Sequence, residues 1–342
     1  MRITIEDVAR EADVSIATVS RFLNGRAGQM SAATRDRVEA VVERLGYVPD
    51  SAARSLKTRR SRLLGVALAD VAHMYWGAVL AGIEAACLER GYGVVISSAG
   101  NDAAAQIDAI ARFLQQRVDG LLLNPTSAEP TVVAGWAALD CPVIMLDRTF
   151  PELSYPLVAS DGRAGARIAV EHLVARGHRD IAFVGWELAG LGNRQERLDG
   201  YRAALAAAGL PVRADRIRFA RESWDDGVNQ TKALFASDRP PTAIFSATME
   251  LNLQVLAALK QLGVRVPAAV SVVGFDAAPW DDLLDPPLTT VAAPARDIGR
   301  LAANLLLAAI ARGEPLARRE HRIRPELVIR ASTGIAHARG KA

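Results

Sequence analysis

From residue 63 onward the chain alternates short apolar runs with amphipathic stretches of helical period, and this alternation restricts the possible folds more than any other feature. The runs predicted as strands are LLGVALA, GVVISS, GLLLNP, VIMLD and the segments 181–185, around 217, 243–246 and 270–275. The stretches predicted as helices are 82–90, 104–116, 132–138, 162–176, 194–208, 226–237, 249–262 and 298–312. Strands and helices that alternate in this way form parallel sheets with helices on both faces.

These strands are too many for one comfortable sheet, so we expect an α/β domain over residues 63–335 made of two doubly wound parallel-sheet lobes. The first lobe is expected to cover about 63–160 and 292–320, and the second about 161–291 and 321–335. The helix over 298–312 is expected to return to the first lobe. Doubly wound sheets bind ligands at the carboxyl ends of their strands, so the cleft between the lobes is the expected ligand site.

The first 46 residues have a different pattern, that of three short helices in a small all-α domain. Thr4 with Asp7, and later Ser15 and Ser31, are start signals of the type found at helix N-termini, and Gly46 supplies a stop. Residues 47–62 follow as a predicted short helix over 49–57 and a basic linker without apolar residues. We therefore expect a helix-turn-helix domain over 1–46 and a hinge over 47–62.

Positive charge is concentrated in these first 62 residues. They hold 12 Lys or Arg against 8 Asp or Glu, whereas the remaining 280 residues hold 29 against 30. Such an excess of positive side chains would attract a polyanion, such as nucleic acid, to this part of the chain. The excess alone is weak support, because many solvated helices carry as much.

The second predicted helix has the layout that a DNA-recognition helix requires. Val19, Phe22 and Leu23 share one face that can pack on the first helix, which leaves Arg21 and small residues on the outer face. Small residues can enter the major groove, and an arginine can bond a guanine edge. An ordinary helical hairpin with a solvated face would show the same pattern.

Both parts of the sequence resemble a known protein family. The first 66 residues are similar to the DNA-binding region of the lactose-repressor (LacI/GalR) family of bacterial transcription factors, through TIEDVAREADVSIATVSRFLNG, MSAATRDRVEAVVERLGYVPDSAARSLK and LLGVAL. The rest resembles the periplasmic-binding-protein-like sensor domain of that family. The segments that carry this second resemblance are QQRVDGLLLNP, PVIMLDR, HLVARGHRDIAFVG, RQERLDGYRAAL, PTAIFSA, VSVVGFD and DPPLTTV.

The resemblance implies a set of DNA-contacting residues. Ile16 and Ala17 fall where the family varies its base-reading residues, and because both are apolar they could sense only thymine methyls or shape, which leaves hydrogen-bonded readout to Arg21. Leu56 matches a hinge leucine that is wedged into the minor groove, although it could also be an apolar residue of a packing helix. The expected contacts are Thr4, Ser15, Ile16, Ala17, Thr18, Ser20, Arg21, Asn24, Arg54, Leu56 and Lys57.

The resemblance also implies an effector site. Arg197 and Asp276 match positions that contact ligand hydroxyls, and Trp224 lies where some members stack an aromatic ring on a sugar. Arg148, directly after a predicted strand, could meet a ligand carboxylate. Each of these residues could instead belong to an ordinary loop or surface.

Two segments depart from the pattern of the family. Many members have Asn-Asp after the strand at 243–246, where this chain reads Ala247-Thr248-Met249-Glu250. The usual Asn-Pro-Phe after the first strand is replaced by Asp70-Val-Ala-His-Met-Tyr-Trp76. Asp70 and Thr248 are therefore weaker candidates for effector contacts, as are His73 and Tyr75.

Enzyme motifs are absent from the sequence. It holds no Walker loop, no G-x-G-x-x-G after a first strand, no H-E-x-x-H and no G-x-S-x-G. His172 and His178 have poor spacing for metal ligands, and the acids at 281, 282 and 285 are typical of a polar loop. We expect neither a catalytic activity nor a cofactor or metal. The alternatives are a doubly wound enzyme, which would need phosphate-cradling glycines, and a solute-binding protein, which would need a signal peptide.

The chain shows no apolar segment of the roughly 20 residues that a membrane span requires, and it has two cysteines inside apolar runs. We expect a cytoplasmic protein with reduced thiols and, because no apolar heptads follow the last strand, a homodimer. Its predicted function is that of a sequence-specific transcriptional regulator, most simply a repressor. Its partners would be a pseudo-palindromic double-stranded DNA operator and a small sugar or sugar-acid effector.

Overall fold

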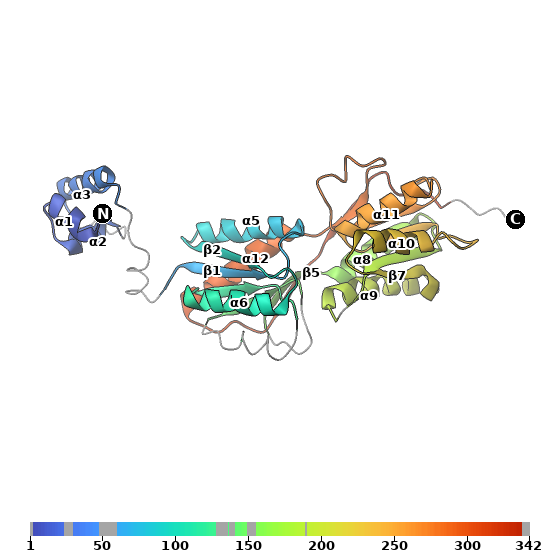
Figure 1. The fold of residues 1–342 in the computed structure, drawn as a ribbon, viewed down its shortest axis with the longest axis horizontal. Coiled ribbons are helices and arrows are strands. Elements are labelled where there is room, and N and C mark those ends of the chain that lie inside the picture. Colours follow the sequence, from blue (N-terminus) through green and yellow to red (C-terminus); the bar gives the residue numbers. More distant parts are fainter. Residues whose placement is uncertain are drawn as a thin grey trace. The chain divides into compact units, whose positions relative to one another are not determined.

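The computed structural model describes residues 3–23, 30–47, 60–127, 136, 141–148, 155–188 and 190–336. The chain divides into two compact units, residues 1–62 and residues 63–342, both drawn in Figure 1. Among the expected contact residues, Asn24, Arg54, Leu56 and Lys57 lie outside the described residues, as does nearly all of the helices predicted over 49–57 and 132–138.

The first unit contains the three predicted helices, α1 (Ile5–Glu11), α2 (Ile16–Leu23) and α3 (Ala32–Leu45). Thr4 and Asp7 form the predicted capping box, Ser31 caps α3, and Gly46 ends α3 in the left-handed conformation. Val8, Val19 and Val38 are fully buried where the three helices meet, and Phe22 and Leu23 pack against them. The predicted interior face of α2 is therefore confirmed.

The second unit contains two six-stranded sheets, one in each lobe. The first sheet has the order β11-β5-β4-β3-β1-β2, with β1 (Leu63–Leu68), β2 (Gly93–Ser98), β3 (Gly120–Leu123), β4 (Val143–Leu146), β5 (Leu157–Ser160) and β11 (Glu320–Ile323). The second has the order β12-β10-β9-β8-β6-β7, with β6 (Ile181–Trp186), β7 (Ile217–Ala220), β8 (Ala243–Ser246), β9 (Ser271–Phe275), β10 (Thr289–Ala292) and β12 (Glu326–Val328). Only β12 pairs antiparallel among the described strands.

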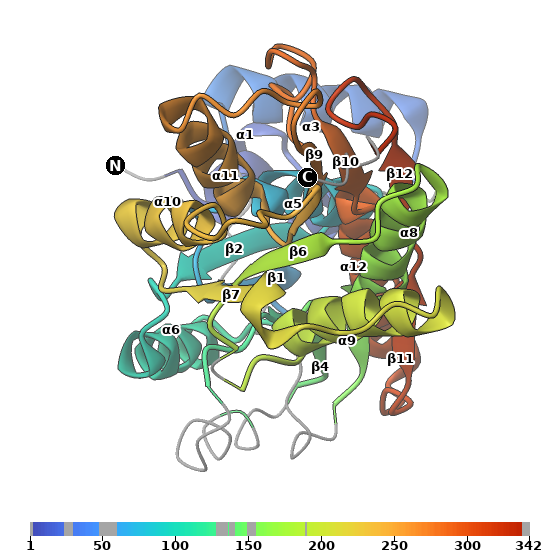
Figure 2. The same cartoon turned by 90° about the vertical axis from the view of Figure 1, so that its right-hand side faces the viewer.

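Helices cover both faces of each sheet, as the alternation predicts. In the first lobe, α5 (Tyr75–Leu88) and α12 (Ala295–Arg312) pack on the side of Leu64 and Val66, while α6 (Ala103–Gln115) packs on the opposite side with Leu121. In the second lobe, α8 (Gly162–Ala175) and α9 (Gly192–Ala207) pack opposite α10 (Trp224–Ala233) and α11 (Met249–Gln261), as Figure 2 shows. A short 3₁₀ turn, η2 (Ala214–Arg216), precedes β7.

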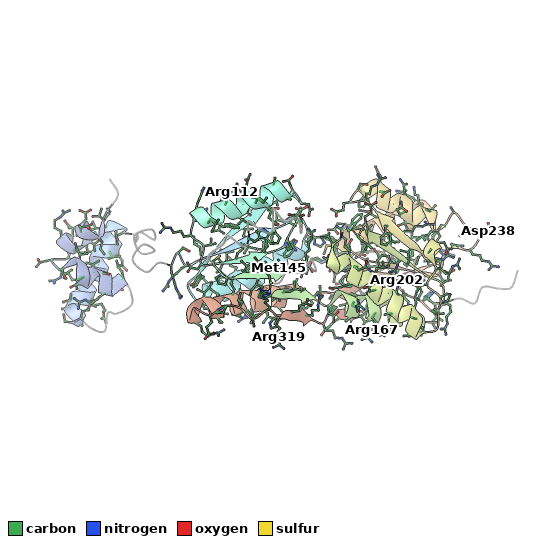
Figure 3. The ribbon with its side chains drawn as sticks, turned by 90° about the horizontal axis from the view of Figure 1, so that it is seen from below. Arg112, Met145, Arg167, Arg202, Asp238 and Arg319 are labelled. Atoms are coloured by element: carbon green, nitrogen blue, oxygen red, sulfur yellow. The ribbon has the colours of Figure 1, made fainter. Side chains whose placement is uncertain are left out.

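Side-chain type follows this layering. Met145 on β4 is almost fully buried inside the first lobe, whereas Arg112, Arg167 and Arg202 extend from the outer faces of α6, α8 and α9 (Figure 3). The apolar faces of the helices thus lie against the sheets and their charged faces lie outward.

The chain crosses between the lobes three times, between β5 and α8, between β10 and α12, and between β11 and β12. The return of the last helix to the first lobe is confirmed, because Ile298 and Leu306 of α12 are buried in the core of that lobe. The last crossing lies three residues later than the predicted boundary near residue 320, because β11 pairs with β5 in the first sheet and the chain leaves that lobe only after Ile323.

Two helix pairs pack closely enough to require glycine at their contacts. A Cβ atom at Gly82 on α5 would lie 2.0 Å from the carbonyl oxygen of Arg296, and one at Gly299 on α12 would lie 2.0 Å from that of Val79. In the second lobe, a Cβ atom at Gly200 on α9 would lie 2.3 Å from the carbonyl oxygen of Arg163. These helices therefore approach one another backbone to backbone.

Candidate DNA-binding surface and effector site

The outer face of α2 presents the residues that were predicted to read bases. Ile16 is 47% exposed, and Ala17 and Arg21 are exposed beside it. The guanidinium of Arg21 lies along the helix, where its Nε donates to the carbonyl oxygen of Ala17 at 3.3 Å and one terminal nitrogen lies 3.4 Å from Thr18 Oγ1. These long, exposed contacts leave the arginine able to turn toward a base.

The hydroxyl groups among the expected DNA contacts have partners within the first unit. The Ser15 and Thr18 hydroxyl oxygens lie 2.9 Å apart, and the Thr18 backbone N–H donates to Ser15 Oγ. Thr4 Oγ1 lies 2.9 Å from Asp7 Oδ2 and accepts from the Asp7 backbone N–H. Ser20 is partly buried. The hydroxyls of Ser15, Thr18 and Thr4 thus stabilise the starts of α2 and α1. A contact of these hydroxyls with DNA would have to share or replace these hydrogen bonds.

The six predicted effector residues all line one cavity of about 390 Å³ in the second unit. Asp70 and Arg148 come from the first lobe, after β1 and β4. The second lobe contributes Arg197 from α9, Trp224 from the start of α10, Thr248 before α11 and Asp276 after β9. The cavity therefore lies at the carboxyl ends of strands from both sheets, as expected for a doubly wound fold.

Arg197 and Asp276 form a buried ion pair in this cavity. One guanidinium nitrogen of Arg197 lies 3.0 Å from Asp276 Oδ2, and the other lies 3.5 Å from Oδ1. Only 12% of the Arg197 side chain and 5% of the Asp276 side chain are exposed. Arg197 also donates to the carbonyl oxygen of Ala247 and lies 3.9 Å above the ring of Phe275. The arginine is thereby held rigidly in place.

Burial raises the pKa of Asp276, and the positive charge of Arg197 only partly offsets this effect. The backbone of Asp276 has a φ of +63°, in the left-handed region that a non-glycine residue seldom adopts. Such strain often occurs where a side chain must be aimed at a ligand. Arg197 Nε is buried and has no hydrogen-bond partner within the described structure.

Asp147, which the sequence interpretation did not include, is the counterpart of Asp276 in the first lobe. It follows β4 with a φ of +60° and lines the same cavity. Its Oδ2 accepts a hydrogen bond of 2.8 Å from Asn193 at the start of α9 in the second lobe. Its neighbour Arg148 donates to Asn101 Oδ1 at 3.1 Å, and burial lowers the pKa of this arginine.

A second contact between the lobes joins His73 to Glu250. His73 Nε2 lies 3.0 Å from Glu250 Oε1, and both residues line the cavity. Burial acts to lower the pKa of His73, but the hydrogen bond and charge of Glu250 outweigh it and the pKa is raised. The Glu250 pKa is correspondingly lowered by His73, against the effect of its own burial.

The remaining candidates differ in how they face the cavity. Trp224 is 52% exposed, so its ring is available for stacking. Thr248 is buried and caps α11 through a 3.5 Å contact with the Leu251 backbone N–H, while Asp70 accepts only from the Ala72 backbone N–H among the described residues. The Tyr75 hydroxyl is buried without a partner there, and burial raises its pKa.

Several residues that the sequence interpretation missed also line the cavity. A simple signal marks Asn124 and Asp147, because each is a polar residue directly after a buried apolar strand. Asn124 donates to the carbonyl oxygen of Leu146 at 2.9 Å and accepts from the backbone of Ala69 at 3.3 Å, which ties β1, β3 and β4 together. Arg194 and Glu222 form an ion pair at the rim.

The residues set aside as metal ligands have structural partners. His172 lies 2.9 Å from Thr333 Oγ1, and Asp281 Oδ2 accepts from Thr290 Oγ1 and the Ala278 backbone. Among the described residues, no three His, Cys, Asp or Glu side chains gather as a metal site would require. None of the helices among the described residues is both long and apolar enough to cross a membrane.

Comparison with known proteins agrees with this architecture. Residues 4–50 match the model of bacterial regulatory proteins of the lacI family, and residues 170–333 match a periplasmic binding protein-like domain. Catabolite control protein A of Priestia megaterium is 33% identical over 306 residues, which cover 90% of this chain and 92% of that protein.

Two solved structures are similar over nearly the whole chain. The lac repressor dimer bound to operator and the anti-inducer ONPF superposes with a TM-score of 0.86 at 31% identity, covering 98% of this chain and all of that one. The complex of the transcriptional regulator CelR with cellobiose has a TM-score of 0.72 at 30% identity and covers 97% of this chain and all of that one.

A helix-turn-helix unit joined to a two-lobed sensor with a polar cavity defines a DNA-binding transcriptional regulator. The chain belongs to the LacI family of such regulators. Its relatives are transcriptional regulators and not enzymes.

Proposed function

We propose that this protein is a homodimeric repressor whose affinity for a pseudo-palindromic operator is controlled by a small sugar or sugar acid bound between the two lobes. The observation that carries this proposal is the single cavity of about 390 Å³ that is lined by all six predicted effector residues. A volume in this range suits a ligand of one or two sugar rings, given that small-molecule pockets span roughly 300–1,000 Å³.

The chemistry of the cavity supports a polyhydroxylated ligand. The ion pair of Arg197 and Asp276 presents a planar donor and a two-oxygen acceptor at one place, and each can hold two neighbouring hydroxyls. The half-exposed ring of Trp224 offers a flat apolar surface that suits the C–H face of a sugar. The known complex of CelR with cellobiose is consistent with a sugar ligand for this fold.

Arg148 supports the sugar-acid alternative. It forms no ion pair with any described carboxylate, although its guanidinium lines the cavity. A ligand carboxylate would provide the bidentate partner that an arginine prefers. With a neutral sugar, the Arg148 guanidinium would keep only its present hydrogen bonds to Asn101 and to the carbonyl oxygen of Pro125.

For the DNA-binding unit, we propose that Arg21 reads a guanine, and that Ile16 and Ala17 contact thymine methyls or respond to groove shape. Leu56, with Arg54 and Lys57, would engage the minor groove and nearby phosphates in a hinge formed by two subunits. The effector would act by favouring one arrangement of the lobes, which would set the spacing of the two DNA-binding units. The lac repressor dimer on its operator provides the precedent for this arrangement.

The test begins with selection of binding sites from random DNA by the full-length protein. A selected site with two-fold symmetry supports dimeric readout, whereas an asymmetric site or no enrichment contradicts it. Arg21→Ala should then lose about 1–3 kcal/mol of binding free energy on the selected site and far less on random DNA. Equal losses on both would show that Arg21 contacts phosphates only.

The effector is tested by titrating glucose, galactose, gluconate and glucose 6-phosphate into the protein–DNA complex. At least one neutral sugar or sugar acid should change operator affinity, and Asp276→Asn should abolish that response while leaving the effector-free affinity nearly unchanged. A response that persists in Asp276→Asn at the same ligand concentration would remove Asp276 from the site. Light scattering at micromolar concentration should give the mass of a dimer.

A further inference from the structure

The two segments that depart from the family pattern contact each other. His73 lies in the segment that replaces Asn-Pro-Phe after β1, and Glu250 lies in the segment that replaces Asn-Asp after β8. Although they belong to different lobes, His73 Nε2 and Glu250 Oε1 are 3.0 Å apart. Two independent departures from the pattern thus form one bond across the cavity.

The local structure fixes the geometry of this bond. The backbone N–H of Tyr75 donates to His73 Nδ1 at 3.2 Å, so Nε2 carries the proton and donates to the Glu250 carboxylate. Because Nε2 is protonated in both the neutral and the charged ring, the bond does not require a charged histidine. The Tyr75 ring packs edge-on against the imidazole, with their centroids 6.2 Å apart.

Few other side chains join the lobes within the described part of the chain. Arg322 pairs with Glu196 at 2.7 Å, but Arg322 lies on β11, next to the last crossing of the chain between the lobes. Asp147 accepts from Asn193 at 2.8 Å. The His73–Glu250 bond and the Asp147–Asn193 bond both lie on the cavity wall, so either would break if the lobes separated there.

We propose that the His73–Glu250 bond is an interlobe latch. It would stabilise the arrangement of the two lobes in this structure, here called closed, before an effector is present. Closure would bring the cavity walls of both lobes together in advance, and a ligand that contacts both lobes would bind more tightly for that reason. The tighter binding of a ligand rests on the proposed function, whereas the latch itself does not.

The expected size of the effect follows from the exposure of the bond. The side chains are 28% and 40% exposed, so water competes for both partners and the bond stabilises closure only moderately. We expect the loss of this bond to reduce the ratio of closed to open molecules by roughly three- to tenfold. A factor of this size corresponds to the modest net stabilisation that a partly solvated hydrogen bond to a charged group provides. Apparent affinity for a ligand of the closed form would fall by up to the same factor.

The test measures the separation of the lobes directly in ligand-free, full-length protein. Spin labels at Gln115→Cys on α6 and Ala207→Cys on α9, with Cys87 and Cys141 replaced by alanine and serine, report the distance between lobes by pulsed electron resonance. His73→Ala and Glu250→Ala should each broaden the distribution toward a second, open population. The double variant should open no further than either single variant, because both remove the same bond.

Two further variants make the result specific. Exchanging the partners, as His73→Glu with Glu250→His, should restore part of the closed population, which a merely damaged lobe could not do. Glu171→Ala removes an exposed ion pair with Arg167 that lies wholly within α8, and it should leave the distribution unchanged. Urea midpoints close to that of the parent protein confirm that all variants are folded.

An unchanged distribution in the single variants, or additive opening in the double variant, would overturn the latch. Neither result would affect the proposed sugar effector, because this measurement uses no ligand and no DNA. Conversely, failure of every sugar and sugar acid in the operator titration would overturn the proposed effector class and leave the latch standing.

Discussion

The two lobes share one strand order, yet they hold their cavity-facing acids differently. Asp147 follows β4 and Asp276 follows β9, which occupy the same place in the two sheets, and both residues have a left-handed backbone. Asp276 is paired with a guanidinium of its own lobe, Arg197, whereas Asp147 is held by an amide, Asn193, of the other lobe. The second lobe therefore pairs its acid within the lobe, whereas the acid of the first lobe is hydrogen-bonded across the cavity.

The largest expected effect of this difference is on stability. Asp276→Ala would leave the Arg197 charge buried without a carboxylate, which typically costs about 3–5 kcal/mol. Asp147→Ala removes only a partner of a neutral amide, so we expect a loss of about 1 kcal/mol. Urea denaturation of both variants measures the two losses. Equal losses would mean that the acids are equivalent after all.

The next largest effect concerns a feature that the lobes share, the close approach of two helices. Gly82→Ala would force α5 away from the Arg296 carbonyl oxygen and should cost about 1–3 kcal/mol, as overpacking does. Gly200→Ala should behave alike in the second lobe. Gly77 on the same α5 helix has open space around it, so Gly77→Ala is the matched control and should change thermal stability little. A harmless Gly82→Ala would show that the contact can relax.

The smallest effect is a pH dependence confined to the second lobe. Burial, together with Arg176 and His178, lowers the pKa of His172 to about 4. Since this value lies below that of the unfolded chain, the neutral ring contributes its full stability above pH 6.5, and the contribution is lost as the pH falls from 6.5 toward 4. The unfolding free energy of His172→Gln should therefore decline less steeply over this window than that of the parent protein. Parallel curves would contradict the assignment.

The sequence predicted those parts of the molecule whose signals are local. Ser31 with Gly46 marked a helix, and the family resemblance marked Asp276, which obeys a simple rule because it is a polar residue directly after a buried strand. The same rule applied to Asn124 and Asp147 would have found both. Four strands were not predicted, β5, β10, β11 and β12. β5 (LVAS) and β10 (TTVA) are buried but only four residues long, with a serine or threonines among the apolar residues. β11 (EHRI) and β12 (ELV) are short edge strands with charged, half-exposed residues, and neither shows an apolar run.

The contact between His73 and Glu250 had no signal in the sequence. Both residues were singled out as departures from a pattern, but their pairing depends on how two separately folded sheets face each other. That arrangement is decided by the three crossings and by side chains far apart in the sequence. Helix caps and strand periodicity carry no information about it.

The three crossings also have a consequence for the order in which the protein is made. The DNA-binding unit precedes both lobes in the sequence and has its own buried core, so it can fold while the ribosome is still adding sensor residues. Neither lobe can be complete that early, since the first needs α12 and β11 and the second needs β12. A nascent chain would thus expose a finished DNA-binding unit before it has a finished sensor.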